Sequence, residues 1–579
     1  MKALKEQGPQ LIGLGLFVGV LSGLAAVFYR WLIGFMQDGF FGGVENPFTA
    51  VVLAPGWRRI LMPALGGLLV GLAAKFLLKK EGASHGVPDV MEAMQFGKPL
   101  PKRVILLRAL TSALTIGSGG SSGREGPIAH IGATVGSAVS SLLKKKGELA
   151  KTIISCGAAG GIAATFNAPI TGAIFALEIF HGDVAVRHFT PIVISSVIAT
   201  VVSNALLQEV SGFPALTSGA FSFHLKSAWE IPIYMAMALL IAGACMLFMI
   251  CLERFEEGFS RLKMPSFLKP MLGGFLLALI AYYFPQLHGF SNYPTVNAVF
   301  EGQYLWYFIA ALGILKMVAT SLTLGSGGTG GVFAPCLFIG AMIGNTFGYG
   351  AHRLFPESTA TAGSYALVGM GALMAGVTGA PLTSVILIFE LSGKYSIVLP
   401  LMITCAISTI LVQIVMKGSV FTRSLIKKGV FYGERRNVLR RKRVREILRA
   451  DFLSVSPQTR LRELLALLPN SKQYAYPVLG PDGGLVGIVS LQDFQAVVFE
   501  EEVADVVVVG DIMTREVLTV TPENTLEEAL LKIGDENIEY LPVLEGGESR
   551  KVLGLVSRRD ILSCYNREIR ESVEAASPI

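Results

Sequence analysis

Long apolar segments separated by short polar ones dominate the first 420 or so residues. Three examples are residues 11–35, 234–252 and 399–416, each close to the ~20 residues that span a hydrocarbon core. The pattern predicts many membrane-spanning α-helices. Because the first segment is longer than a signal-peptide core and has no small-residue cleavage site, we expect it to stay in the protein as a helix.

The pattern changes near residue 450 to short β-rich runs and amphipathic helical segments. This region is duplicated, because residues 453–494 parallel residues 518–561. Each copy predicts the order strand, helix, strand, strand, helix. We therefore expect a C-terminal pair of α/β domains.

Composition agrees with a membrane protein. Apolar residues make up 52% of the chain and charged residues 16%, against about 25% in soluble domains. The mean hydropathy is +0.57. The six cysteines have no metal-ligand spacing, so they indicate neither a disulfide framework nor a metal site. A soluble globular protein is excluded, and a polytopic membrane protein is expected.

A basic run follows the last apolar segment. Residues 423–449 contain eleven Lys and Arg but two Glu. Such a run beside a span is typical of the cytoplasmic face. A nucleic-acid site is the competing interpretation, but a juxtamembrane location already explains the charge, so we expect no nucleic-acid partner.

Glycine-rich motifs occur twice at nearly constant spacing. The stretch GSGGSSGREGP (117–127) matches GSGGTGGVFAP (325–335) at a separation of 208. Residues 157–179 match residues 369–391 at a separation of 212. Two matches in one register indicate an internal duplication of about 200 residues.

Glycine breaks at matching points of two membrane halves point to discontinuous helices that meet near the membrane midplane. The first N–H groups of such a helix have no intrahelical partner, and the helix dipole adds partial positive charge. An anion is attracted there. The alternative is that the glycines serve only close helix packing.

Glu125 stands in the first glycine break, where an anion is expected. An ionisable residue inside a membrane segment is by default a functional candidate. A tethered carboxylate can occupy the anion site and leave when protonated or displaced, so we predict that Glu125 is a gate. Its neighbour Arg124 is either an ion-pair partner or a group that draws anions inward.

These motifs resemble the CLC family of chloride channels and proton-coupled chloride exchangers. The resemblance spans about residues 10–430 and depends on GREGP (123–127), GGVFAP (330–335) and FNAPITGAIFALE (166–178). It implies an α-helical fold with two inverted-topology repeats, and a homodimer with one anion pathway per subunit. It also implies a gate at Glu125 and anion-binding positions at His85, Gly86, Gly123, Arg124, Val332, Phe333 and Phe421.

The sequence departs from the family pattern at three places. His85 replaces a serine that usually coordinates the anion, and it is interpreted either as an anion-site residue or as a cap of its own turn. Ile179 replaces the inner proton-relay glutamate, which leaves Glu178 beside it as a proton-route candidate together with Glu125. Phe421 replaces a pore-lining tyrosine. These departures affect the central anion site and the proton route, so the sequence supports anion passage more strongly than proton exchange.

The C-terminal duplication resembles a CBS-domain pair. Each copy ends in Ser-x-x-Asp, Ser490 to Asp493 and Ser557 to Asp560. The resemblance implies nucleotide binding there, to ATP, ADP or AMP. The alternative is an ordinary N-cap at the start of a helix.

Enzyme classes find little support. Ser122 lies in a GxSG pattern typical of intramembrane serine proteases, but such a nucleophile needs a positioned base. The chain has no HExxH motif of a zinc protease. A cation pathway, as in a magnesium transporter, would favour rings of acids over glycine-rich helix starts.

We therefore expect an integral membrane protein, of a prokaryotic inner (plasma) membrane, that passes chloride or a similar monovalent anion in a channel-like or weakly coupled way. A proton/chloride antiporter is the alternative. The predicted domains are a transmembrane domain (1–430, with halves at about 10–210 and 225–420), a basic linker (431–445) and a cytoplasmic regulatory CBS pair (446–579). No required cofactor and no metal site are predicted.

Overall fold

The fold is taken from a computed structural model of the chain. It describes residues 2–43, 47–77, 86–181, 186–207, 225–289, 292–427, 439, 441–467, 473–490, 493, 506–535, 538–546 and 549–574. The chain divides into two compact units, Met1–Val430 and Phe431–Ile579. The expected histidine at position 85 lies outside the described residues.

The first unit is built from helices in two successive halves. The first half contains α1 (Lys2–Phe41), α2 (Pro47–Leu53), α3 (Gly56–Leu77), α4 (Val87–Phe96), α5 (Arg103–Gly117), α6 (Glu125–Leu142), α7 (Gly147–Phe166), α8 (Pro169–Ala176), the π turn η1 (Leu177–His181) and α9 (Val186–Leu207). The second half contains α11 (Glu230–Arg261), α12 (Lys269–Tyr283), α13 (Asn292–Phe300), α14 (Trp306–Gly325), α15 (Phe333–Leu354), α16 (Ala362–Thr378), α17 (Pro381–Ser392), α18 (Val398–Met416) and α19 (Val420–Lys427). Short 3-10 turns, η2 (Ser266–Leu268), η3 (Pro285–Leu287) and η5 (Tyr395–Ile397), connect some of them.

Within the described residues, eight helices are long and apolar enough to cross a membrane. The helices differ in how deeply they are buried in the protein. In α7, 78% of the apolar window is buried, whereas in α3 only 22% is. Exposed aromatic side chains such as Trp31 and Phe35 of α1 are expected to face lipid, because lipid tails are as apolar as they are. The polytopic helical architecture predicted from the hydrophobic pattern is confirmed.

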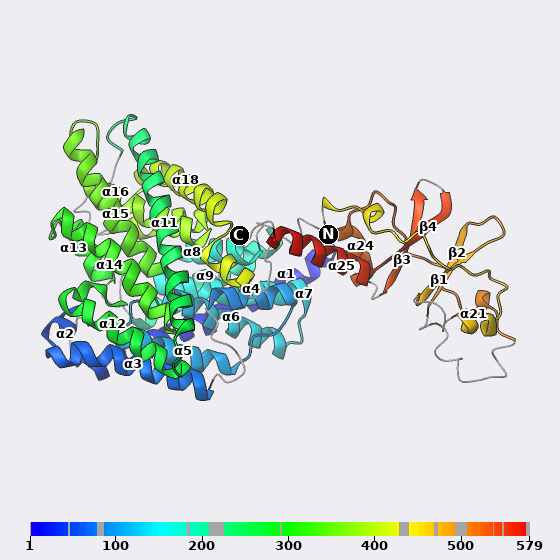
Figure 1. The fold of residues 1–579 in the computed structure, drawn as a ribbon, viewed down its shortest axis with the longest axis horizontal. Helices are drawn as coiled ribbons and strands as arrows, with labels where there is room; N and C mark the ends of the chain where they lie inside the picture. Colours follow the sequence, from blue (N-terminus) through cyan, green and yellow to red (C-terminus); the bar gives the residue numbers. More distant parts are fainter. Residues whose placement is uncertain are drawn as a thin grey trace. The chain divides into compact units, whose positions relative to one another are not determined.

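The two halves repeat the same pairs of packed helices. Helix α6 packs on α7 as α15 packs on α16, and α1 packs on α9 as α11 packs on α18. Figure 1 shows α14 and α15 of the second half side by side in green. The sequence duplication is therefore a structural duplication.

Glycines set the closest crossing in each half. A Cβ added at Gly132 of α6 would lie 2.1 Å from the Gly157 carbonyl oxygen of α7. In the second half, a Cβ at Gly340 of α15 would lie 2.2 Å from the Gly369 carbonyl oxygen of α16. Since no side chain fits at such distances, these glycines serve close helix packing.

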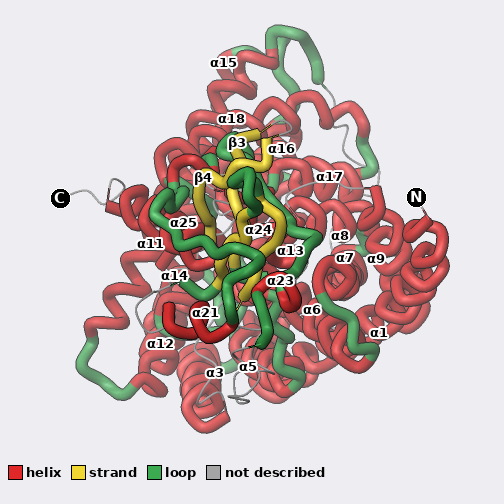
Figure 2. The backbone as a smooth tube through the Cα atoms, turned by 90° about the vertical axis from the view of Figure 1, so that its right-hand side faces the viewer, coloured by secondary structure: helices red, strands yellow, loops and turns green. Residues whose placement is uncertain are grey.

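The second unit contains all four strands of the described chain, drawn in yellow in Figure 2. Strands β1 (Ala475–Leu479) and β2 (Leu485–Ser490) pair antiparallel, as do β3 (Tyr540–Gly546) and β4 (Ser549–Ser557). Single parallel bridges extend both sheets in the same way, Val455 with Val478 and Val520 with Val543. The helical elements are η6 (Val444–Glu446), α21 (Leu461–Leu467), α23 (Val509–Ile512), α24 (Leu526–Asp535) and α25 (Arg558–Glu574). The predicted tandem α/β pair is confirmed.

The segment that precedes each copy packs in the core of the other copy. Val444 is completely buried in the core that also contains Val520 and Leu541, whereas Val509 is buried with Leu461 and Tyr476. The packed core thus includes Val444, which precedes the predicted start of the CBS pair at 446.

The basic residues at the start of this unit are paired with its own acids. Lys442 contacts Glu446 at 3.0 Å and Glu568 at 2.9 Å. These carboxylates raise the pKa of Lys442. The pKa of Glu446 is lowered, mainly by the hydrogen bond from the Arg443 backbone N–H and also by Lys442. This part of the basic run thus makes contacts within the second unit.

Candidate functional site

The two glycine-rich breaks meet in the middle of the first unit. The Gly123 N–H donates to the Gly331 oxygen at 2.8 Å, and the Gly331 N–H donates to the Gly123 oxygen at 2.8 Å. A Cβ at Gly331 would lie 2.7 Å from the Gly126 nitrogen, so the two loops touch through bare backbone. Glycine is therefore needed for the close approach of the two breaks as well as for the packing of the helices.

Hydroxyl groups join the two breaks in a reciprocal way. The Ser121 N–H donates to Thr323 Oγ1 at 3.0 Å, and the Thr329 N–H donates to Thr115 Oγ1 at 3.1 Å. Each acceptor lies near the end of the helix that precedes a break, α5 or α14. The breaks are consequently held as one rigid element with matching connections from both halves.

Three helices begin around this element without a side-chain cap. Helix α4 begins after Gly86, α6 after Arg124 and α15 after Val332, and none of these three residues caps its helix through its side chain. The first N–H groups of such helices need an acceptor from elsewhere. Uncapped N-termini that lie close together therefore form an anion-attracting region.

Glu125 is the first residue of α6 and is completely buried. The Tyr293 hydroxyl donates to its Oε1 at 2.7 Å, whereas Oε2 has no hydrogen-bond partner among the described residues. A Cβ built on Gly123 would lie 2.3 Å from Oε2 and 3.1 Å from the Ala334 nitrogen. One carboxylate oxygen thus lies beside the start of α15, in the opposite half.

Arg124 contacts Tyr293. Its guanidinium lies over the Tyr293 ring, 5.3 Å from the ring centroid. Its Nε has no hydrogen-bond partner among the described residues. Arg124 was predicted either to pair with Glu125 or to draw anions inward. The contacts among the described residues include no ion pair between Arg124 and Glu125. The same tyrosine therefore contacts both charged residues of the break. Tyr293 was not predicted from the sequence. It lies in the short helix α13, and no recognisable motif surrounds it.

The predicted anion-binding positions Gly86, Val332, Phe333 and Phe421 lie near one another. A Cβ at Gly86 would lie 3.5 Å from the Gly126 oxygen, and Gly86 has a positive φ of 78°. Phe333 is 1% exposed, and its ring centroid lies 5.9 Å from that of Phe421. The structure thus brings these positions together with Gly123 and Glu125, but their role in binding an anion stays a prediction.

A cavity of about 100 Å³ adjoins this cluster. It is lined on one side by Val87, Gly126, Val332, Phe333 and Phe421, and on another by Glu253, Glu256 and Arg423. Residues at the uncapped helix starts and charged residues thus line the same cavity.

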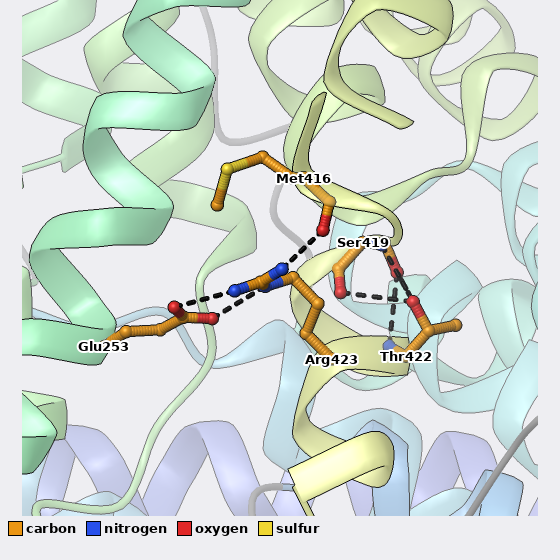
Figure 3. Close-up of polar contacts among 5 residues, drawn as sticks. All are labelled: Glu253, Met416, Ser419, Thr422 and Arg423. Carbon is orange, nitrogen blue, oxygen red and sulfur yellow. Dashed lines mark hydrogen bonds and ion pairs between the residues drawn. The ribbon is translucent and has the colours of Figure 1, made fainter. Parts of the chain in front are cut away.

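An ion pair at the rim ties α19 to α11 (Figure 3). Arg423 Nε donates to Glu253 Oε1 at 2.7 Å, and its Nη2 donates to Oε2 at 2.9 Å. Arg423 Nη1 donates to the Met416 carbonyl, and Ser419 and Thr422 bond each other at the start of the same helix. The turn before Phe421 is thereby fixed.

The proton-route candidate Glu178 caps a helix of the other half. Its carboxylate accepts the Leu382 N–H at 3.0 Å, the Thr383 N–H at 2.8 Å and the Thr383 hydroxyl at 2.6 Å, all at the start of α17. Glu390 makes the equivalent contacts with Ile170 and Thr171 at the start of α8. Both carboxylates stabilise helix N-termini, and a proton role for Glu178 stays a prediction.

Ser122 carries no sign of an activated nucleophile. It is buried in the first break, and its Oγ has no hydrogen-bond partner among the described residues. A general base in hydrogen-bond reach is what a serine protease requires. The geometry therefore does not favour the protease alternative.

The candidate nucleotide residues of the second unit form capping contacts. Ser490 Oγ donates to Asp493 Oδ2 at 2.8 Å, and Ser557 Oγ donates to Asp560 Oδ2 at 2.5 Å. Asp560 Oδ1 also pairs with Arg449. In the second copy the Asp560 N–H also donates to Ser557 Oγ at 3.1 Å, so the N-cap interpretation is observed there, and nucleotide binding stays a prediction.

Comparison with known proteins agrees with this architecture. Residues 66–413 match the family model described as voltage gated chloride channel, and residues 444–500 and 509–567 match CBS domains. A ClcB-like chloride channel protein of Ralstonia nicotianae is 34% identical over 71% of this chain and 95% of its own length. Chloride channel protein CLC-f of Arabidopsis thaliana is 27% identical over 94% of this chain and 79% of its own length.

Solved structures show the same fold. A slow cyanobacterial Cl⁻/H⁺ antiporter superposes with a TM-score of 0.64 at 22% identity, covering 72% of this chain and 98% of that one. A eukaryotic CLC transporter superposes with a TM-score of 0.64 at 20% identity, covering 95% of this chain and 97% of that one. The chain is therefore a membrane protein that belongs to the voltage gated chloride channel family, the CLC proteins, and carries a C-terminal CBS-domain pair.

Proposed function

We propose that this protein carries chloride or a similar monovalent anion across the bilayer through a pathway that Glu125 closes. The observation that carries the proposal is the buried carboxylate of Glu125, whose Oε2 has no partner among the described residues and lies beside the uncapped start of α15. A negative group at that place has the charge and position of the transported anion.

The gate operates by competition between two anions. While the Glu125 carboxylate occupies the helix starts, a free anion is excluded by like charge. Protonation removes the charge of the carboxylate, and a high anion concentration displaces it; in both cases the side chain must leave the Tyr293 hydroxyl, which donates to Oε1 at 2.7 Å. Acid therefore promotes anion flux.

Transport is channel-like or weakly coupled to protons. Ile179 is apolar at the position where the family resemblance places the inner proton-relay acid. The neighbouring Glu178 already accepts three hydrogen bonds at the start of α17. Both observations support a pathway without an inner proton acceptor.

A proton/chloride antiporter is the second candidate. Structural relatives of this chain are described as antiporters, including a slow cyanobacterial Cl⁻/H⁺ antiporter and a CLC-type fluoride/proton antiporter. In this case Glu178 or a water chain would deliver protons to Glu125.

The proposal includes a homodimer in a prokaryotic inner membrane, with the CBS pair on the cytoplasmic side. The basic run that starts after the last span supports this orientation. The CBS pair regulates the pathway rather than forming it, and ATP, ADP or AMP is the candidate ligand. Binding in the second copy requires Asp560 to exchange its contact with Arg449 for ribose hydroxyls.

The test is simultaneous measurement of chloride and proton movement in proteoliposomes that contain the full chain. We expect chloride efflux down its gradient and little uphill proton movement. Stoichiometric uphill proton pumping driven by chloride would establish the antiporter instead. A reversal potential that follows the cation gradient would overturn anion transport itself.

A further inference from the structure

Glu148, His181 and His188 come together away from the anion pathway. Glu148 lies in the first turn of α7, His181 ends η1 and His188 lies in the first turn of α9. One potential ligand atom from each of the three residues lies within 4.8 Å of the others. The sequence predicts no metal site, because the three side chains come from separate segments without ligand spacing.

The protonation pattern of His188 follows from its contacts. The side chain is buried, and its Nδ1 lies 2.6 Å from the Thr152 hydroxyl. Thr152 has one hydroxyl hydrogen, which it donates to the Glu148 backbone oxygen at 2.9 Å. With its hydrogen on Nδ1, His188 donates to Thr152 while Thr152 donates to the Glu148 backbone oxygen, and both contacts are satisfied. This leaves Nε2 to face the Glu148 carboxylate.

A cation between Nε2 and this carboxylate would be stabilising. The distance from His188 Nε2 to Glu148 Oε2 is 4.0 Å. In neutral histidine with a hydrogen on Nδ1, Nε2 presents a lone pair, and a lone pair and a carboxylate oxygen repel each other. Either a proton on Nε2 or a metal ion between the two atoms removes the repulsion. Metal-binding histidines commonly donate their other ring N–H to an outer hydrogen-bond acceptor, and the Thr152 hydroxyl would take that place for His188.

His181 completes the arrangement. Its ring stacks on that of His188 with a centroid distance of 4.8 Å, and its Nε2 lies 3.0 Å from Ser155 Oγ. Glu148, Thr152 and Ser155 follow each other at helical spacing, so α7 presents one polar stripe to both imidazoles. Two histidines thus have hydrogen-bond partners on the same helix that supplies the carboxylate.

We propose that Glu148, His181 and His188 bind a divalent transition-metal cation, with zinc as the best-fitting ion. Two imidazoles and one carboxylate are a ligand set that zinc accepts, with a fourth position left for water. In a tetrahedral zinc site, ligand atoms lie about 3.4 Å apart. The ligand atoms of the three residues lie within 4.8 Å of one another, and those of His188 and Glu148 are 4.0 Å apart, so metal binding would draw the three side chains closer together.

Lys151 opposes metal binding. Its Nζ donates to Glu148 Oε1 at 2.7 Å and so brings a positive charge next to the carboxylate. The contact leaves Oε2 directed to His188. Removing the lysine charge should therefore increase the affinity for the metal without altering a ligand. Such a variant tests the proposal by a gain in affinity rather than a loss.

A bound metal would tie three segments at one end of the membrane unit. Lys144, Lys145 and Lys146 precede α7, so this end is cytoplasmic by the positive-inside rule. The metal would join α7 and α9 to η1, which contains Ile179 and follows α8. It would therefore restrain the inner end of the first half. Metal binding itself does not depend on the proposed transport function.

The test uses the full chain in detergent, purified without a polyhistidine tag and stripped with a chelator. Calorimetric titration with Zn²⁺ should give one ion per chain. His181→Gln and His188→Gln should each weaken Zn²⁺ binding at least tenfold, and Thr152→Val should weaken it by about tenfold. Lys151→Met should tighten it. The matched control is His352→Gln, a distant histidine replacement in α15, which should bind Zn²⁺ as the unaltered chain does.

The absorption spectrum of added Co²⁺ provides a second readout that depends on coordination geometry. A tetrahedral Co²⁺ spectrum that His188→Gln abolishes supports the site. The proposal is overturned if the unaltered chain takes up no stoichiometric Zn²⁺, or if His181→Gln, His188→Gln and Thr152→Val bind it as tightly as His352→Gln. If a ligand variant does not fold, an unchanged affinity in Lys151→Met, whose side chain is half-buried and is not a ligand, counts against the proposal.

Discussion

The two glycine breaks have almost the same backbone but opposite chemistry at one position. Gly119 and Gly327 have φ values of 105° and 103°, and each break is closed by an equivalent hydrogen bond, Gly120 to Thr115 at 2.8 Å and Gly328 to Thr323 at 2.9 Å. At the repeat separation of 208, however, Glu125 corresponds to Phe333. The shared features build the fold, whereas the difference at this position provides the candidate gate.

The asymmetry extends to the neighbouring positions. Arg124 corresponds to Val332, so both charged residues at the two aligned helix starts come from the first half. Tyr293 contacts both charged side chains through its hydroxyl and its ring. The second half contributes an uncapped helix start and the aromatic contact between Phe333 and Phe421. The first half thus supplies a buried carboxylate, and the second half supplies the tyrosine and the helix start beside which it lies.

The largest expected effect comes from breaking the feature that the halves share. In Gly331→Ala, the new Cβ would lie 2.7 Å from the Gly126 nitrogen, so the two breaks must separate. We expect a loss of about 3 kcal/mol in stability, at the upper end for overpacking. The measurement is the thermal unfolding midpoint in detergent.

The matched control is Gly350→Ala in α15, where an added Cβ meets nothing within 4 Å. Alanine there should leave the midpoint unchanged or raise it slightly, since alanine favours a helix by up to about 1 kcal/mol over glycine. Equal midpoints for the two variants would contradict the proposed contact between the breaks.

The next effect concerns the reciprocal caps. Glu178→Gln and Glu390→Gln each exchange a carboxylate that accepts two backbone N–H groups and a threonine hydroxyl for a neutral amide. Hydrogen bonds to charged groups contribute about 1.5–3 kcal/mol each, so we expect each variant to lose about 2 kcal/mol. The two losses should be similar, because the contacts are equivalent.

The comparison of these two variants also separates structure from proton transfer. If Glu178→Gln abolished proton movement while Glu390→Gln left it intact, Glu178 would act in a proton route in addition to its cap. Similar transport by both folded variants would support the purely structural interpretation.

Sequence alone was sufficient for the parts of the structure that repeat. Periodic apolar segments and the constant spacing of the glycine motifs gave the helical architecture, the duplication and the meeting of the two breaks, where Gly123 and Gly331 bond each other. Tyr293 could not be found in this way, because it reaches Glu125 across 168 positions and belongs to no motif. The cap made by Glu178 was missed for the same reason, since its partners lie in the other half.

The smallest effect is expected at this tyrosine. Tyr293→Phe removes the hydroxyl that donates to Glu125 Oε1 and should release the gate more easily. A net contribution of about 1.4 kcal/mol, near the low end for a hydrogen bond to a charged group, corresponds to a roughly tenfold rise in anion flux near neutral pH. Flux in proteoliposomes measures it, and Tyr304→Phe in the second half is a control. A lower flux from folded Tyr293→Phe would argue that the tyrosine opens the pathway instead.

The central claim is that one charged side chain distinguishes the two helix starts and closes the pathway. Its most direct test is the pH dependence of chloride flux through Glu125→Gln, compared with the unaltered chain in the same proteoliposomes. We predict that the unaltered chain passes more chloride as the pH falls, because protonation neutralises Glu125, and that Glu125→Gln passes chloride at a high rate that hardly changes with pH. A folded Glu125→Gln protein with the same rise in flux on acidification as the unaltered chain would contradict the claim.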